Sequence, residues 1–146
     1  MTLQIFLRNH LQLRIIRNWG FVSFLFIVII KGIIRPMNIE LSKCGTLLQG
    51  ILPNFFASTG YTAIVFLLST YVLYKKKNKL FITKTLIFAI LFSFSGLFIW
   101  EYLQYFIWRY PVDYFDIIAS AVGAALTGIF IFFISKQLKV NVFQKA

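Results

Sequence analysis

Residues 44–74, CGTLLQGILPNFFASTGYTAIVFLLSTYVLY, form a long apolar stretch without a single charged side chain. A helix needs about 20 predominantly apolar residues to cross the hydrocarbon core of a bilayer, so this stretch is long enough to span it. We place the span at about residues 53–74, with Pro53 in the first helical turn, where its missing N–H is no loss. The stretch therefore predicts a transmembrane helix.

The composition of the whole chain agrees with a lipid environment. Hydrophobic residues make up 60% and charged residues 13% of the 146 residues, whereas soluble domains contain about 45–50% and about 25%. A chain this short cannot bury so much apolar surface within itself, because small domains bury the smallest fraction of their surface. The single cysteine, Cys44, excludes an internal disulfide.

Three further apolar blocks predict spans at about residues 18–34, 80–100 and 117–135. Lys31 and Lys84 lie near the ends of their blocks, where a long basic side chain can extend to the headgroups. With the span at 53–74, these blocks predict an all-α membrane protein, a four-transmembrane-helix bundle in a single domain of residues 1–146.

The amino-terminal residues 1–17 mix apolar and basic side chains, and we expect them to lie along the inner membrane surface as an interfacial helix. A cleaved signal peptide is the alternative for the first block. The sequence that closes this block, IIKGIIRPMNIE at residues 29–40, is bulky and charged, whereas a cleavage site has small residues. The first block is therefore interpreted as a span.

The basic residues predict the orientation of the bundle. Four spans place ten of them on one side: Arg8, Arg14, Arg17, Lys75, Lys76, Lys77, Lys79, Lys136, Lys139 and Lys145. The other side receives Arg35, Lys43 and Arg109. Because cytoplasmic loops are rich in Lys and Arg, both termini are predicted to be cytoplasmic. The basic residues sit between apolar blocks rather than on one face, so the net charge of +11 does not indicate a nucleic-acid partner.

The same topology places all the acidic residues on the outer side, namely Glu40, Glu101, Asp113 and Asp116. Acidic residues contribute little to orientation, so this segregation needs a separate explanation. Glu101 ends an apolar run about as long as the hydrocarbon core is thick, which places it near the outer boundary. Gln104 follows by three residues, on the same side of a continuing helix. Arg109 lies in the short connection, where it can pair with a carboxylate such as Asp113.

Polar residues on the second and fourth spans are predicted to face this outer cluster. Asp116 stands at the start of the fourth span, and Ser120 follows on the same helical face. Asn54, Ser58 and Thr62 are spaced by four in the outer half of the second span. We expect the two rows to face each other, and Glu101, across a small cavity open to the outer surface.

These residues carry a resemblance to a known family. The pattern E-x-x-Q, then Arg, then D-x-x-D-x-x-x-S-x-x-G occurs as Glu101, Gln104, Arg109, Asp113, Asp116, Ser120 and Gly123. Together with LPNF at residues 52–55, it resembles the VanZ-like family of small bacterial membrane proteins. Ser120 stands where that family more often has Asn. The resemblance implies the same fold, a location in the bacterial cytoplasmic membrane, and a link to resistance against teicoplanin-type glycopeptide antibiotics.

Four hypotheses for the outer cluster remain open at this point. It is an ion-paired lock between the third and fourth spans, or a binding and modulating site for an envelope precursor, a lipid or an amphipathic antibiotic. Alternatively, Glu101 and Asp113 or Asp116 form the acid–base pair of an intramembrane enzyme. The last hypothesis is a small transporter or flippase, against which the absence of charge from the middle of each span argues. No metal or other cofactor is expected, since the only histidine, His10, lies on the opposite side.

Overall fold

The computed structural model describes residues 10–37, 42–75 and 82–135. They form, in chain order, α2 (Leu11–Ile29), the π-helical turn η1 (Ile30–Ile34), α3 (Lys43–Lys75), α4 (Ile82–Trp108) and α5 (Tyr114–Ser135). α2 together with η1, and each of α3, α4 and α5, is long and apolar enough to cross a membrane. These residues include no strand. The prediction of an all-α, four-transmembrane-helix bundle is confirmed, and this is the architecture of a multi-pass membrane protein.

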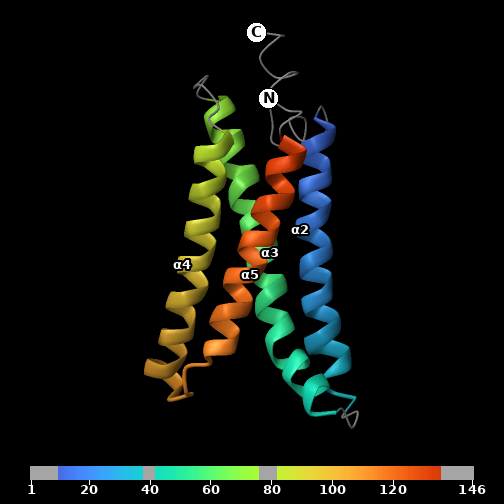
Figure 1. Cartoon of the computed structure of the whole chain (residues 1–146), viewed down its shortest axis with the longest axis vertical. Helices are drawn as coiled ribbons and strands as arrows, with labels where there is room; N and C mark the ends of the chain where they lie inside the picture. The colour runs from blue at the N-terminus through green and yellow to red at the C-terminus, as the bar shows by residue number, and fades with distance from the viewer. Residues whose placement is uncertain (1–9, 38–41, 76–81, 136–146) are drawn as a thin grey trace.

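The helices run alternately up and down, so the bundle has two distinct ends (Figure 1). One end, which we call the basic end, contains the start of α2 and α4 and the close of α3 and α5. The other, the acidic end, contains η1, the first turns of α3, the last turns of α4 and the start of α5. Glu101, Asp113 and Asp116 all lie at the acidic end, whereas Glu40 lies outside the described residues.

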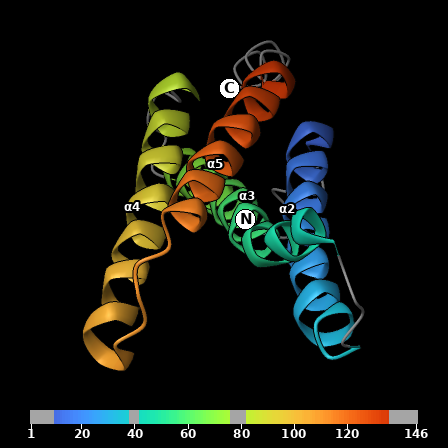
Figure 2. The ribbon, with the colours of Figure 1, turned by 60° about the horizontal axis from the view of Figure 1, so that its bottom comes forward.

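α3 is the central helix, because it contacts every other helix of the bundle. It crosses α5, so that α3 approaches α2 at the acidic end while α5 approaches α4 (Figures 1 and 2). Small residues permit the crossing: the Ser58 hydroxyl donates to the carbonyl of Ser120, and the Thr59 hydroxyl to that of Gly123 at 3.5 Å. A Cβ added at Gly123 would collide with the Phe55 carbonyl. The crossing therefore depends on the absence of a side chain at this glycine.

α3 begins at Lys43, so Pro53 lies inside the helix, and the prediction that Pro53 occupies the first turn is wrong. An interior proline deprives the carbonyl four residues earlier, here that of Gln49, of its helical donor. Arg35 replaces this donor, because its Nη2 lies 3.1 Å from the Gln49 oxygen and 3.3 Å from that of Gly50. α3 therefore continues past Pro53, and the Gln49 carbonyl accepts its hydrogen bond from Arg35.

The expectation of an interfacial helix is wrong for residues 11–17, and residues 1–9 lie outside the described part of the chain. Residues 11–17 belong to α2 and continue directly into the first span. Leu13 and Ile16 are fully buried, in a core with Phe66 of α3 and Ile131 of α5. Their spacing of three residues places them on one helical face, so burial against α3 and α5 extends the transmembrane helix.

The hydrophobic core lies in the basic half of the bundle. Its buried members are Leu13, Ile16, Ala63, Phe66, Leu67, Ile82, Leu86, Ala89 and Ile131. By contrast, the last turns of α4 carry large exposed side chains, among them Phe106, Ile107 and Trp108. The described contacts that hold the acidic half are therefore mainly those of the helix crossing and of its polar side chains.

Candidate functional site

The candidate site lies at the acidic end, where α4 and α5 bring the described carboxylates together. Glu101 of α4 is only 8% exposed. Its Oε1 accepts a hydrogen bond of 3.2 Å from Nε2 of Gln104, one turn later on the same helix. The backbone amide of Asp113 also donates to this carboxylate. Since a buried carboxylate needs hydrogen-bond donors, these two amides explain how Glu101 is accommodated.

Asp116 connects the beginning of α5 to α3. Its carboxylate accepts a hydrogen bond from the Asn54 side chain, so the polar rows predicted on the second and fourth spans meet here. One turn deeper, the Ser58 hydroxyl bonds to the backbone of Ser120 rather than to its side chain. Oδ1 of Asp116 is buried without a hydrogen-bond partner. This oxygen is therefore a buried acceptor that no described donor uses.

Charges of opposite sign are arranged on opposite sides of the acidic end. Glu101 interacts electrostatically with both Asp116 and Asp113. Asp116 is in turn influenced by two cations, Arg35 and Lys31, which come from the end of the first helix. Asp116 thus lies between the other two carboxylates and the basic side chains at the end of the first span.

Arg109 has a different role from the ion pairing that we predicted. It stands directly after α4 with φ of 60°, in the left-handed region, and its N–H donates to the carbonyl of Tyr105 at 3.1 Å. A residue in this conformation commonly ends a helix. The hydrogen bonds to the carboxylates come instead from Asn54, Gln104 and backbone amides. Arg109 therefore ends α4, and the ion-paired lock through Arg109 is not the way the cluster is held.

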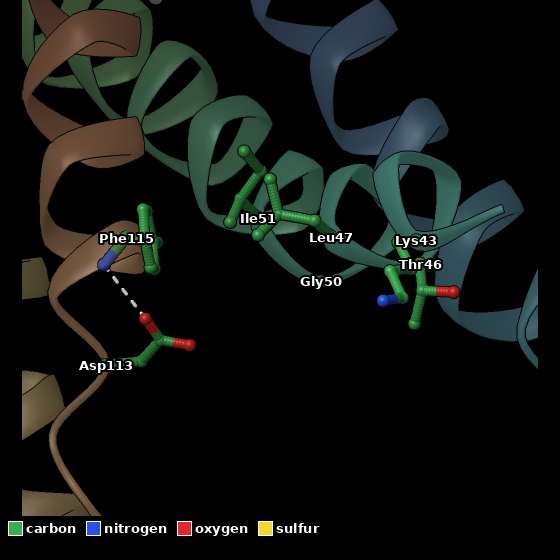
Figure 3. Close-up of a pocket in the computed structure, with 7 residues that line it drawn as sticks. All are labelled: Lys43, Thr46, Leu47, Gly50, Ile51, Asp113 and Phe115. Atoms are coloured by element: carbon green, nitrogen blue, oxygen red, sulfur yellow. Dashed lines mark hydrogen bonds between the residues drawn. The ribbon is translucent and has the colours of Figure 1, made fainter.

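A pocket of about 480 Å³ opens beside these carboxylates, between the first turns of α3 and the α4–α5 connection (Figure 3). It is lined by Lys43, Thr46, Leu47, Gly50, Ile51, Asp113 and Phe115. Of the predicted site residues, only Asp113 lines it. The α3 residues were missed because the span was started at Pro53. Their spacing along residues 43–51 is that of one helical face, which is the signal that identifies them.

The described residues include no group of three or more His, Cys, Asp and Glu side chains that could hold a metal ion. The donors and acceptors that the site offers are carboxylates, amides and the Lys43 ammonium. Such groups bind ammonium, phosphate and hydroxyl groups of a ligand by charge-assisted hydrogen bonds.

The site thus belongs to a multi-pass membrane protein and lies at one end of its helical bundle. No family model, curated protein or solved structure matches this chain. The VanZ-like resemblance accordingly stays a prediction, and the function is argued from the site itself.

Proposed function

We propose that this chain is a multi-pass protein of the bacterial cytoplasmic membrane that binds an envelope component at the outer surface. In this proposal the acidic end faces outward, as the distribution of Lys and Arg predicts. The observation that carries the proposal is the pocket beside Asp113, next to a carboxylate cluster in which Asp116 Oδ1 has no partner. A pocket with a few convergent polar groups is the usual form of a ligand site.

Binding explains the cluster better than a purely structural lock. In a lock, the carboxylates would be neutralised by direct pairing, and a bidentate arginine is the strongest partner for that purpose. Here Arg109 ends α4, and the Asp116 carboxylate keeps an unused acceptor. Transport has less support, because Glu101 and Asp116 lie toward one end of the bundle and no charged residue occupies the middle of a span.

The VanZ-like resemblance supplies the biological setting of the proposal. It points to an effect on the cell envelope, visible as altered susceptibility to teicoplanin-type glycopeptides. In this setting the ligand is an envelope precursor, a lipid or the amphipathic antibiotic, each of which is present at the outer surface.

A second candidate function is an acid–base reaction on such a ligand. Glu101 and Asp116 are close enough to interact electrostatically, and their environments differ, since Glu101 accepts two hydrogen bonds and Asp116 has a free oxygen. Unequal environments are what allow two carboxylates to divide the roles of acid and base. Release of a chemically altered lipid or precursor by the purified protein would favour this candidate.

The experiment that tests the proposal compares Glu101→Gln and Asp116→Asn with the unaltered protein in cells. Membrane abundance and glycopeptide susceptibility are measured on the same cultures, and Lys75→Gln at the basic end serves as the matched loss of one charge. We expect both carboxylate variants to keep their abundance and lose the effect on susceptibility. Loss of abundance together with the effect would instead support a structural role. Expression of the unaltered chain without any change in susceptibility would refute the glycopeptide link.

A further inference from the structure

The pocket at the acidic end is bounded by charges of opposite sign. Lys43 begins α3 on one side, and Asp113 lies in the α4–α5 connection on the other. Figure 3 shows the two side chains on opposite sides of the space, with the apolar side chains of α3 between them. A pocket of this kind is complementary to a ligand that carries both a cation and an anion.

The Asp113 carboxylate is fixed in its orientation. Its Oδ1 accepts a hydrogen bond of 2.8 Å from the backbone N–H of Phe115, at the beginning of α5. This bond holds one oxygen against the helix end and leaves the second toward the pocket (Figure 3). A fixed carboxylate binds an ammonium group with less loss of side-chain freedom than a mobile one.

Apolar side chains form the remaining surface of the pocket. Leu47 and Ile51 lie one turn apart on α3, and Phe115 stands opposite on α5. Gly50 has no side chain, which leaves room between them. Leu47 is 46% and Phe115 58% exposed, so the pocket surface continues into the apolar surface that faces the lipid. A ligand in this pocket can therefore keep its apolar part in the bilayer.

We propose that the pocket binds a phospholipid whose headgroup carries a primary ammonium and a phosphate, as in phosphatidylethanolamine. The ammonium donates to Asp113, the phosphate accepts from Lys43, and the glycerol and first acyl carbons lie against Leu47 and Ile51. This inference rests on the proposed function, for which it names the ligand. The volume of about 480 Å³ is within the range of about 300–1,000 Å³ for small-molecule sites, so it suits a headgroup.

Other headgroups fit this arrangement less well. An anionic headgroup without an amine leaves Asp113 facing a negative charge, which disfavours binding. A choline headgroup keeps its positive charge but has no N–H to donate to the carboxylate. The pocket is therefore expected to prefer ethanolamine lipids over both glycerol and choline lipids.

Binding of short-chain lipids to the purified full chain in detergent tests this inference, with native mass spectrometry as the readout. The probes are short-chain phosphatidylethanolamine, phosphatidylglycerol and phosphatidylcholine, and water-soluble phosphoethanolamine. Phosphatidylethanolamine should bind most tightly, and Asp113→Asn and Lys43→Gln should each weaken it roughly tenfold, as expected for the loss of one charge-assisted contact. Asparagine retains an oxygen for the Phe115 amide, so the connection stays in place. Lys75→Gln should bind as the unaltered chain does.

Equal affinity for the three lipids, or unchanged phosphatidylethanolamine binding in both pocket variants, would overturn the inference. Phosphoethanolamine that binds as tightly as the lipid would overturn it too, since the apolar walls would then contribute nothing. Melting temperatures of the variants in the same detergent identify any variant that fails to fold. If Asp113→Asn fails to fold, Lys43→Gln still tests the inference, because the Lys43 side chain is exposed. The cellular phenotype of the Glu101 and Asp116 variants is measured separately. If the pocket shows no lipid preference but Glu101→Gln and Asp116→Asn abolish the effect on susceptibility, the lipid inference fails and the proposed outer-surface function stands.

Discussion

Replacement of Arg35 by methionine is expected to destabilise the bundle by removing the donor that serves the proline-interrupted part of α3. Arg35 Nη2 donates to the carbonyls of Gln49 and Gly50 at 3.1 and 3.3 Å. Pro53 cannot donate to the Gln49 oxygen, so that carbonyl depends on Arg35. A hydrogen bond from a charged donor contributes about 1.5–3 kcal/mol, and for this exposed contact we expect the lower part of that range, about 1.5–2 kcal/mol. Methionine retains the apolar length of the side chain and removes the guanidinium.

A double-mutant cycle with Pro53→Ala isolates the part of this effect that belongs to the proline. Alanine at position 53 restores an N–H that can donate to the Gln49 carbonyl within the helix. Arg35→Met should then cost less in the Pro53→Ala background, with a coupling free energy of about 1 kcal/mol. The assay is reversible unfolding of the purified protein in mixed micelles, followed by circular dichroism as the denaturing detergent increases.

Lys31→Met is the matched control, because Lys31 of η1 lies one turn before Arg35 and also acts electrostatically on Asp116. It should show no coupling to Pro53. An equal cost of Arg35→Met with proline or alanine at position 53 would refute the reasoning, since the Gln49 carbonyl would then not be what Arg35 serves. No cost in either background would show that the contact contributes nothing to stability.

Three further substitutions test other contacts by the same unfolding assay. Gly123→Ala should destabilise the bundle by about 1–3 kcal/mol, because the added Cβ has no room at the helix crossing. Gly96→Ala is the control: its added Cβ meets nothing within 4 Å, so it should not lower the stability. Asn54→Ala should cost about 1 kcal/mol by removing the donor to the partly buried Asp116 carboxylate, and an undiminished stability would contradict the contact with Asp116. Arg109→Gly should stabilise by about 1 kcal/mol, since glycine adopts a φ of 60° without the side-chain clash of other residues.

The number and type of the helices were predictable from sequence because runs of apolar residues bounded by basic segments leave few alternatives. The position of Pro53 inside α3 was not predictable in this way. The rule for proline is local, whereas the group that compensates for it, Arg35, comes from another helix. The start of the first span was misplaced for a related reason. The basic residues near Leu13 and Ile16 suggest a helix on the membrane surface. The apolar face formed by Leu13 and Ile16 is instead buried against α3 and α5, which are distant in sequence.

The candidate site was predictable in part. Spacing by four residues placed Asn54 and Asp116 on helical faces that could meet, and the structure brings them into contact. The pocket residues Lys43, Thr46 and Leu47 were missed because the helix was started too late. The backbone conformation of Arg109 has no sequence signal, since its side chain suggested a charged partner and left-handed residues are usually glycine.

α3 and α5 are in close contact at Gly123, so a change in their crossing angle moves their ends at the acidic end relative to each other. Along the helices, Asp113 lies about 15 Å and Lys43 about 20 Å from this crossing, so a rotation of roughly 5° about it changes their separation by about 1–2 Å. Transmembrane helices adjust their tilt to the thickness of the bilayer. The width of the pocket is thus coupled to the thickness of the surrounding membrane, and the proposed lipid ligand is expected to bind with different affinity in thin and thick bilayers.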